Sequence, residues 1–249
     1  MKTSIKHIFI GFIQGLTEFL PVSSSGHIVL FGSLFDLDNL LLISIVAHIG
    51  TLFAVLFCYR DKIISLIKNP KNPTNLFLII ATIPTVIIVL LFNDKIDALF
   101  STKSLVWGFI LSAFLLLVAD FKSNKNKYID KKSSLVMGIA QGLAIMPGIS
   151  RSGATLTCGL LLGRDKQESL EFSFLMSIPI IIGSAVYESV KLFSCQLNIQ
   201  WTNILLVMIS SFVFGILSIK LMLKVVKTNK LYYFSIYMVV LSLFIVYFI

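Results

Sequence analysis

Two stretches of small polar residues interrupt an otherwise apolar chain, and both have the composition of an anion-binding loop. The first is Gln14-Gly15-Leu16-Thr17-Glu18-Phe19-Leu20-Pro21-Val22-Ser23-Ser24-Ser25-Gly26-His27, and the second is Pro147-Gly148-Ile149-Ser150-Arg151-Ser152-Gly153-Ala154-Thr155. Small residues at the start of a helix leave backbone N–H groups free, and the helix dipole there favours negative charge. We therefore expect the two stretches to form one phosphate-handling site.

Arg151 is the most informative residue of the second stretch. The chain has 21 basic residues, and its other two arginines, Arg60 and Arg164, lie at loop edges. A guanidinium in apolar surroundings needs an anion, and its several donors suit phosphate. The alternative is a salt bridge to Glu18 that only pins the two stretches together.

The small residues of both stretches complete the predicted phosphate site. Their alternative role is close helix packing in the membrane. The substrate-binding set predicted here is Ser23, Ser25, Gly26, Gly148, Ser150, Ser152, Gly153 and Thr155.

The first stretch adds groups that can move protons or hold a cation. Glu18 lies inside an apolar segment, and Gln14 shares its helix face one turn earlier. Their oxygens are suited to hold Mg²⁺ or Ca²⁺ with help from a substrate phosphate, and the alternative is a structural hydrogen bond between them. His27 can act as general acid, general base or nucleophile. We interpret His48 and His7 as structural.

The composition places these groups in a membrane protein. Hydrophobic residues make up 57% of the 249 residues and charged residues 13%, with a mean hydropathy of +0.93. The apolar runs are near the length of a spanning helix, so helices are expected throughout. The net charge of +9 comes from short basic clusters between apolar runs, which is typical of cytoplasmic loops and argues against nucleic-acid binding. The three cysteines have no paired spacing, so neither a disulfide nor a zinc site is expected. Because Gln14 and Glu18 interrupt the first apolar run, we expect no removable signal peptide.

The order of apolar and polar segments predicts an all-α polytopic protein, a single membrane domain over residues 1–249. It has two halves, 1–120 and 133–249, joined by a hydrophilic cytoplasmic linker at 121–132. Each half begins with a re-entrant helical hairpin, 5–31 or 133–163, that is broken by proline and serine. The six predicted transmembrane helices are 38–59, 74–92, 103–120, 170–191, 201–223 and 231–249.

The two halves also match residue by residue when they are shifted by 127 positions. Gln14-Gly15-Leu16 then matches Gln141-Gly142-Leu143, Ser23 matches Ser150, and Ser25-Gly26 matches Ser152-Gly153. Because each half has an odd number of spans, the second half must be inverted relative to the first, a known arrangement for broken helices that meet near the membrane midplane.

The distribution of basic residues predicts the orientation. Fifteen of the 21 fall in connections on one side of the predicted layout. The positive-inside rule makes that side cytoplasmic and puts both termini outside. The first hairpin then enters from outside and the second from the cytoplasm, so their tips can meet.

At this point the chain resembles a known family, the bacterial undecaprenyl-diphosphate phosphatases, also called bacitracin resistance proteins. The resemblance rests on the two stretches above, supported by His48-Ile-Gly-Thr-Leu and Phe172-Ser-Phe-Leu-Met-Ser-Ile-Pro179, and it covers essentially the whole chain. The family's acidic motif allows Glu or Gln at position 14.

The resemblance implies hydrolysis of undecaprenyl diphosphate to the monophosphate and inorganic phosphate in the bacterial plasma membrane. Such an enzyme recycles the lipid carrier for peptidoglycan synthesis and confers bacitracin resistance. The roles it implies are catalysis by Glu18 and His27, and nucleophilic attack or phosphate binding by Ser24. It also implies diphosphate binding by Ser150, Arg151 and Thr155. The choice of nucleophile among Ser24, His27 and water stays open.

The expected partners are the polyprenyl diphosphate and membrane lipid. A homodimer is left open, and we expect a divalent cation as cofactor and include Arg151 in the catalytic set. The alternative function is a lipid-carrier flippase or secondary transporter, because an inverted repeat suits transport equally well.

Overall fold

The structure is a computed structural model, and it describes residues 3–35, 37, 39–99, 102–121, 126–192, 200–228 and 230–248. Cys195, Lys2 and part of the predicted linker, including Lys122 and Lys125, lie outside the described residues. The described residues form eleven α-helices and one short 3₁₀ helix, without a named strand. The helices are α1 (Thr3–Phe19), α2 (Ser24–Phe35), α3 (Leu40–Cys58), α4 (Arg60–Lys68), α5 (Pro73–Leu99), α6 (Thr102–Phe121), α7 (Lys131–Leu143), α8 (Arg151–Leu161), α9 (Lys166–Leu192), α10 (Trp201–Val225), η1 (Val226–Thr228) and α11 (Tyr232–Phe248).

Each of the two segments predicted as hairpins contains a pair of helices separated by a short break. The break between α1 and α2 contains Ser23, whose φ of 65° is left-handed, and the break between α7 and α8 contains Gly148 with φ of 85°. A Cβ at position 148 would also lie 2.4 Å from the carbonyl oxygen of Leu105, so glycine is required there. The polar runs read from the sequence therefore end one helix and begin the next.

Four helices are long and apolar enough to cross a membrane. These are Leu40–Cys58, Pro73–Phe92, Lys166–Val190 and Trp201–Thr228. The apolar parts of α6 and α11 are shorter, at Ser104–Asp120 and Tyr232–Phe248. Each of the six predicted spans thus coincides with a helix, and four of them are candidate membrane spans by length and composition.

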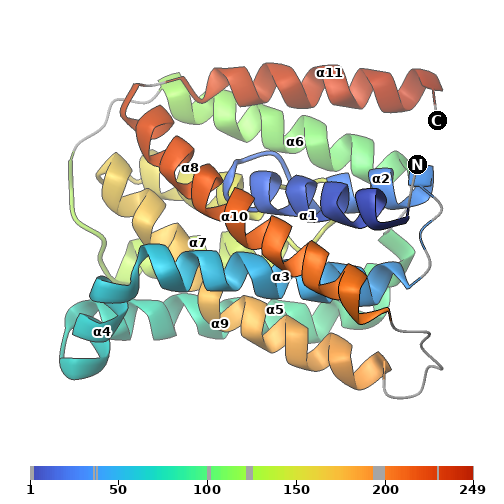
Figure 1. Cartoon of the computed structure of the whole chain (residues 1–249). Helices are drawn as coiled ribbons and strands as arrows, with labels where there is room; N and C mark the ends of the chain where they lie inside the picture. The colour runs from blue at the N-terminus through green and yellow to red at the C-terminus, as the bar shows by residue number, and fades with distance from the viewer. Residues whose placement is uncertain are drawn as a thin grey trace.

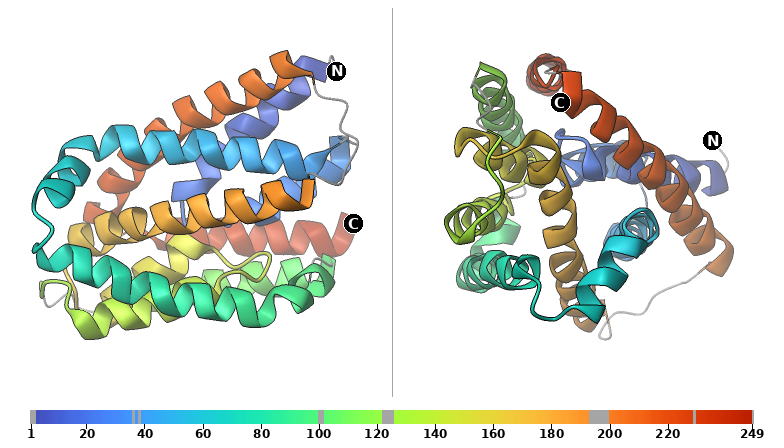
Figure 2. Two further views of the ribbon diagram at one scale, coloured as in Figure 1. Left: turned by 90° about the horizontal axis from the view of Figure 1, so that it is seen from below. Right: turned by 90° about the vertical axis from the view of Figure 1, so that its left-hand side faces the viewer.

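The long helices run roughly side by side, and the N-terminal end of α1 and the C-terminal end of α11 lie at the same end of the bundle (Figures 1 and 2). The opposite end holds α4 and the turn from α10 through η1 into α11 (Figure 1). Six basic residues lie in these elements, at the end away from the termini: Arg60, Lys62, Lys68, Lys220, Lys224 and Lys227.

The two halves of the chain exchange packing partners. Helix α1 of the first half packs chiefly against α10 of the second, and α7 of the second half packs against α5 of the first. Both contacts use glycines one turn apart that let backbones approach closely. A Cβ on Gly11 or Gly15 would lie within 2.6 Å of an α10 carbonyl oxygen, and a Cβ on Gly138 would lie 2.2 Å from the carbonyl oxygen of Ala81. Gly11 and Gly138 are again 127 positions apart.

Two local features were not anticipated from the sequence. Residues 60–68, interpreted only as a polar connection, form the helix α4, which buries Leu66. Helix α7 starts at a capping box in which Asp130 accepts from the backbone of Ser133 and Ser133 accepts from that of Asp130. Burial opposes the charged form, but the bonds from Ser133 and the Arg164 guanidinium outweigh it and hold the pKa of Asp130 below its usual value.

The close approach of α7 to α5 can be tested with two glycines in helix interiors. Gly138→Ala forces these helices apart and should lower the free energy of unfolding by about 1–3 kcal/mol. Gly183→Ala meets no atom within 4 Å and should be neutral, or stabilising by up to about 1 kcal/mol through helix propensity. Thermal unfolding in detergent measures both, and equal effects of the two substitutions would contradict the packing described here.

Candidate active site

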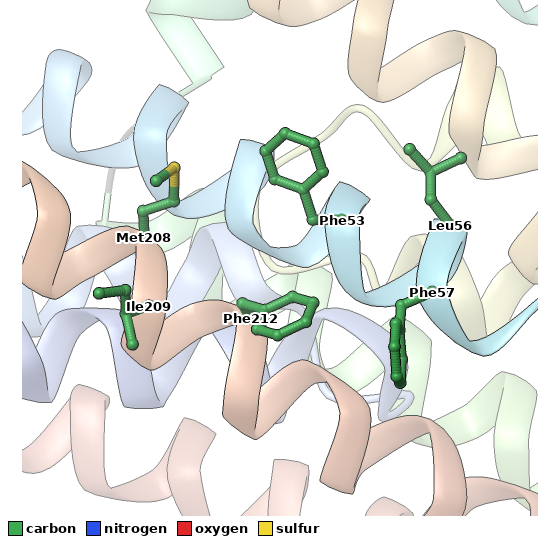
Figure 3. Close-up of a pocket in the computed structure, with 6 residues that line it drawn as sticks. All are labelled: Phe53, Leu56, Phe57, Met208, Ile209 and Phe212. Atoms are coloured by element: carbon green, nitrogen blue, oxygen red, sulfur yellow. The ribbon is translucent and has the colours of Figure 1, made fainter.

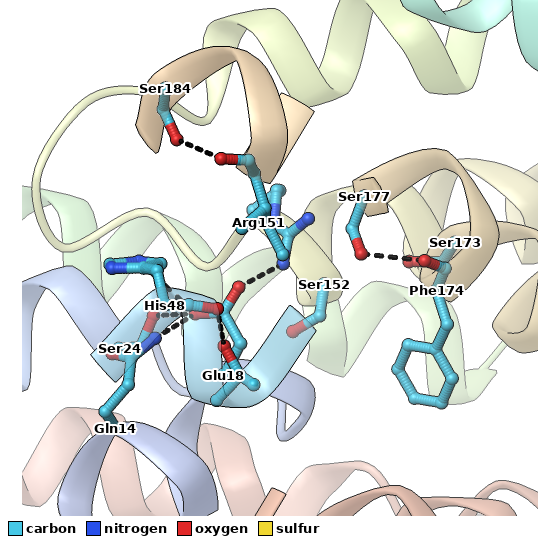
Figure 4. Close-up of polar contacts among 12 residues, drawn as sticks. Gln14, Glu18, Ser24, His48, Arg151, Ser152, Ser173, Phe174, Ser177 and Ser184 are labelled. Carbon is cyan, nitrogen blue, oxygen red and sulfur yellow. Dashed lines mark hydrogen bonds and ion pairs between the residues drawn. The ribbon is translucent and has the colours of Figure 1, made fainter. Parts of the chain in front are cut away.

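The Glu18 carboxylate is the centre of a buried polar cluster. Glu18 is only 5% exposed. One oxygen, Oε2, accepts hydrogen bonds from Gln14 Nε2 at 2.9 Å and Ser24 Oγ at 2.6 Å, and the other, Oε1, pairs with Arg151. Figure 4 shows Gln14, Ser24 and His48 converging on the carboxylate, with Arg151 reaching it from another direction. Four helices, α1, α2, α3 and α8, thus supply one site.

His48 is part of this cluster, whereas the sequence predicts a structural role for it. Its Nε2 lies 3.7 Å from Glu18 Oε2, and its side chain is 25% exposed. The other nitrogen, Nδ1, lies 2.8 Å from the carbonyl oxygen of Ser44, one turn earlier in α3. Because a carbonyl only accepts, Nδ1 carries a proton, and in the neutral ring Nε2 is an acceptor directed at the site. The signal that could have found it is a histidine inside a predicted span.

Arg151 is the first residue of α8, and its side chain is 20% exposed. Its Nη2 pairs with Glu18, whereas Nη1 is buried without a hydrogen-bond partner. A buried guanidinium nitrogen without a partner is costly, since it loses its hydration. The arrangement leaves one end of the guanidinium free for an anion beside Glu18.

The serines around Arg151 fix the second hairpin tip against the first. Ser150 caps α8 by accepting from Gly153 N, and Ser152 Oγ donates to the carbonyl oxygen of Leu20 at 2.9 Å. Thr155 bonds Ser173 Oγ at 2.6 Å and is fully buried. The two tips therefore meet as predicted, and Ser152 is engaged in holding them together, whereas Thr155 ties α8 to α9.

The residues of the first tip divide into two groups. Ser24 reaches Glu18, whereas Ser23 bonds locally, since its Oγ lies 3.4 Å from both Ser25 Oγ and Gly26 N. Gly26 lies against the Phe109 ring, where a Cβ would meet a ring carbon at 2.6 Å. Ser23, Ser25 and Gly26, which were predicted to bind phosphate, thus determine the local structure of the tip and make no contact with Glu18 among the hydrogen bonds described.

His27 has hydrogen-bond partners other than the carboxylate. It is 1% exposed, its Nδ1 lies 2.8 Å from the carbonyl oxygen of Ser23, and its Nε2 lies 2.7 Å from the hydroxyl of Tyr237 in α11. Both ring nitrogens are thus engaged by partners other than Glu18. The hydrogen bonds of His27 therefore run to Ser23 and Tyr237, and its catalytic role stays a prediction.

The predicted cation site has an incomplete set of ligands within the chain. Among the described residues, no group of three or more His, Cys, Asp or Glu side chains could hold a metal ion. Gln14 Oε1 is, however, a buried acceptor without a partner beside Glu18. Mg²⁺ commonly takes one or two protein oxygens and completes its shell with substrate phosphate and water. Gln14 and Glu18 fit such a substrate-assisted cation.

A separate pocket of about 430 Å³ lies between α3 and α10 (Figure 3). Its lining is almost wholly apolar and consists of Phe53, Leu56, Phe57, Met208, Ile209 and Phe212. Such a lining cannot satisfy a diphosphate, because it offers no donor to the oxygens. The polar cluster around Glu18, and not this pocket, is therefore the candidate site for a diphosphate.

Known proteins of one family are similar to this chain over nearly its whole length. The family model described as bacitracin resistance protein BacA matches residues 7–244. The chain is 37% identical over 247 residues to an undecaprenyl-diphosphatase of Carboxydothermus hydrogenoformans, covering 96% of this chain and 95% of the relative. It is 38% identical over 250 residues to one of Halothermothrix orenii, covering 97% and 96%, and 38% identical over 239 residues to undecaprenyl-diphosphatase 3 of Bacillus cereus, covering 94% and 92%.

The buried pair of Glu18 and Arg151 predicts strong energetic coupling. Glu18→Gln or Arg151→Met alone leaves a buried charge without its partner and should cost about 3–5 kcal/mol of folding free energy. The double variant removes both charges and should cost less than the sum of the two. Unfolding of the four proteins in one detergent measures this, and additive effects would show that the pair is not coupled.

Proposed function

This chain belongs to the bacitracin resistance protein BacA family, and we propose that it is an integral membrane phosphatase that hydrolyses undecaprenyl diphosphate to undecaprenyl phosphate and inorganic phosphate. Its relatives over almost the full chain carry the name undecaprenyl-diphosphatase. These names favour hydrolysis over the transport alternative. In this role the enzyme recycles the lipid carrier for peptidoglycan synthesis and confers bacitracin resistance.

The observation that carries the proposal is the arrangement of Arg151, Glu18 and Ser24. Arg151 holds Glu18 with one end and has a buried, unpartnered Nη1 at the other, which suits a phosphoryl oxygen. Ser24 donates to the same carboxylate. An anion-binding donor thus lies beside a hydroxyl that is hydrogen-bonded to a potential base.

The reaction breaks the anhydride bond between the terminal phosphorus and the bridging oxygen. The nucleophile attacks the terminal phosphorus, its proton passes to Glu18, and the bridging oxygen leaves with the prenyl monophosphate. Ser24 Oγ or a water held by Glu18 fits this role better than His27, because both nitrogens of His27 have other partners. With Ser24 as nucleophile, a phosphoserine would form and water would then hydrolyse it.

Arg151 supplies the charge stabilisation that dominates phosphoryl transfer. Helices α2 and α8 begin at Ser24 and Arg151, which both reach Glu18, so their N-terminal dipoles would add to this stabilisation. A divalent cation held by Gln14 Oε1, Glu18 and substrate oxygens would supply further neutralisation of the diphosphate.

We also propose the full layout of six spans and two re-entrant hairpins as an inverted repeat. The packing of α1 against α10 and of α7 against α5, each between the two halves, supports this layout. Helix α6 has 20 residues and α11 has 17, so at about 1.5 Å per residue they nearly match a bilayer core of about 30 Å. The basic elements opposite the termini support a cytoplasmic position for that end and an outer position for the termini.

Release of inorganic phosphate from a C55 diphosphate in detergent tests the activity directly. Arg151→Ala removes the anion-binding donor, so turnover should fall by about 10²–10³-fold or more. Arg60→Ala is the matched control, since the Arg60 side chain is 66% exposed on α4, and should retain full turnover. A folded Arg151→Ala protein with near wild-type turnover would sink the proposal.

The cation role of Gln14 is testable without assuming which ion binds. A chelator should abolish phosphate release, and Mg²⁺ or Ca²⁺ should restore it. Gln14→Ala should raise the ion concentration needed for half-maximal activity by about tenfold, the smaller end of effects on metal affinity. Gln141→Ala is the control at the equivalent position of the second half, where the side chain bonds Thr85, and its ion requirement should not change. Activity that persists in chelator contradicts the cation proposal.

A further inference from the structure

Two side chains on the last helices of the two halves hold the chain breaks from which the site is built. In α11, the Tyr237 hydroxyl lies 2.7 Å from His27 Nε2, and the two rings are nearly parallel at 9°. Because His27 Nδ1 donates to the Ser23 carbonyl, in the neutral ring Nε2 is the acceptor and Tyr237 the donor. The chain of bonds ends at Ser23, whose left-handed φ turns the backbone into α2.

The residue after this break is Ser24, which donates to Glu18. Tyr237 therefore acts on the site through His27, by fixing where α2 begins. This assigns His27 a positioning role, in contrast to the catalytic role that the family resemblance implied.

Ser112 in α6 does the same for the second break. Its Oγ accepts from Ser150 N at 2.8 Å and lies 3.3 Å from the Gly148 carbonyl oxygen, to which it donates. Ser112 is 2% exposed, and the residue after Ser150 is Arg151. Loss of this hydroxyl would leave a buried backbone N–H without its partner.

The two bonds cross between the halves of the chain. Helix α6 belongs to the first half and holds the break of the second, while α11 belongs to the second half and holds the break of the first. Helices α6 and α11 pack against each other. The pair α6 and α11 therefore supports both tips. It thereby fixes how Ser24, Glu18 and Arg151 are placed relative to one another.

We propose that Tyr237 and Ser112 are positioning residues that align the two hairpin tips for reaction. The proposal rests on the proposed phosphatase function, because its consequence is the rate at which Ser24 or water attacks phosphate held by Arg151. Misalignment affects the transition state more than the binding of the diphosphate, so the loss appears in kcat.

The first test is steady-state phosphate release by single-atom variants with matched controls. Tyr237→Phe loses one hydrogen bond and Ser112→Ala loses two, and each should lower kcat by about 5- to 10-fold with KM changed less than about twofold. Tyr247→Phe, at an 83% exposed tyrosine of the same helix, and Ser242→Ala, at a buried serine bonded within α11, should match wild type. Unchanged kcat in both Tyr237→Phe and Ser112→Ala overturns the proposal, while the Arg151→Ala result still judges the function by itself.

A double variant tests whether Tyr237 acts through His27. His27→Phe with Tyr237→Phe should be no slower than His27→Phe alone, and a further multiplied loss would overturn this link. Nitrogen NMR of the three histidines gives a readout that needs no activity. Tyr237→Phe should shift the Nε2 signal of His27 and leave that of His48 in place, and an unmoved His27 signal would show that the bond does not form.

Discussion

The ion pair between Glu18 and Arg151 is the constraint on which the rest of the structure depends. A carboxylate that is 5% exposed inside an apolar bundle needs a counter-charge, because desolvation of an isolated ion costs several kcal/mol. The counter-charge comes from the other half of the chain, 133 positions away. The two hairpin tips must therefore meet, and the close packing of α1 on α10 and of α7 on α5 brings them to the same place.

The two halves of the chain have equivalent helices, but the side chains at equivalent positions of the site differ. Ser24 and Arg151 are 127 positions apart and each is the first residue of its helix, yet both reach the same carboxylate. The position equivalent to Glu18 is Ile145. Gln141, the counterpart of Gln14, bonds Thr85 instead and ties α7 to α5. Since both tips serve one carboxylate, equivalent positions are free to diverge into a hydroxyl on one side and a guanidinium on the other.

Much of this arrangement could be predicted from the sequence, because it follows from local signals. Apolar length and turn residues predict helices and their breaks, and the predicted span 38–59 differs from α3 by only a few residues. The meeting of the tips followed from the odd number of spans in each half. Helix α4 was missed because nine residues are too short to show a helical period clearly. The partner of His27 could not be predicted, because Tyr237 lies 210 positions away.

The two histidines show why residue type and spacing do not assign roles by themselves. His27 lies in the polar stretch, yet its two nitrogens are fully engaged by Ser23 and Tyr237. His48 lies in an apolar run, yet Ser44 fixes its tautomer so that Nε2 faces Glu18 Oε2 at 3.7 Å. In the neutral ring these are two acceptors facing each other, and a shared proton donor satisfies both. A water molecule has two O–H donors for such acceptors, and Arg151 Nη1 is a buried donor without a partner in the same cluster. The side chains that retain unused hydrogen-bonding capacity, rather than the most polar stretch of sequence, thus define the part of the site that faces its ligand.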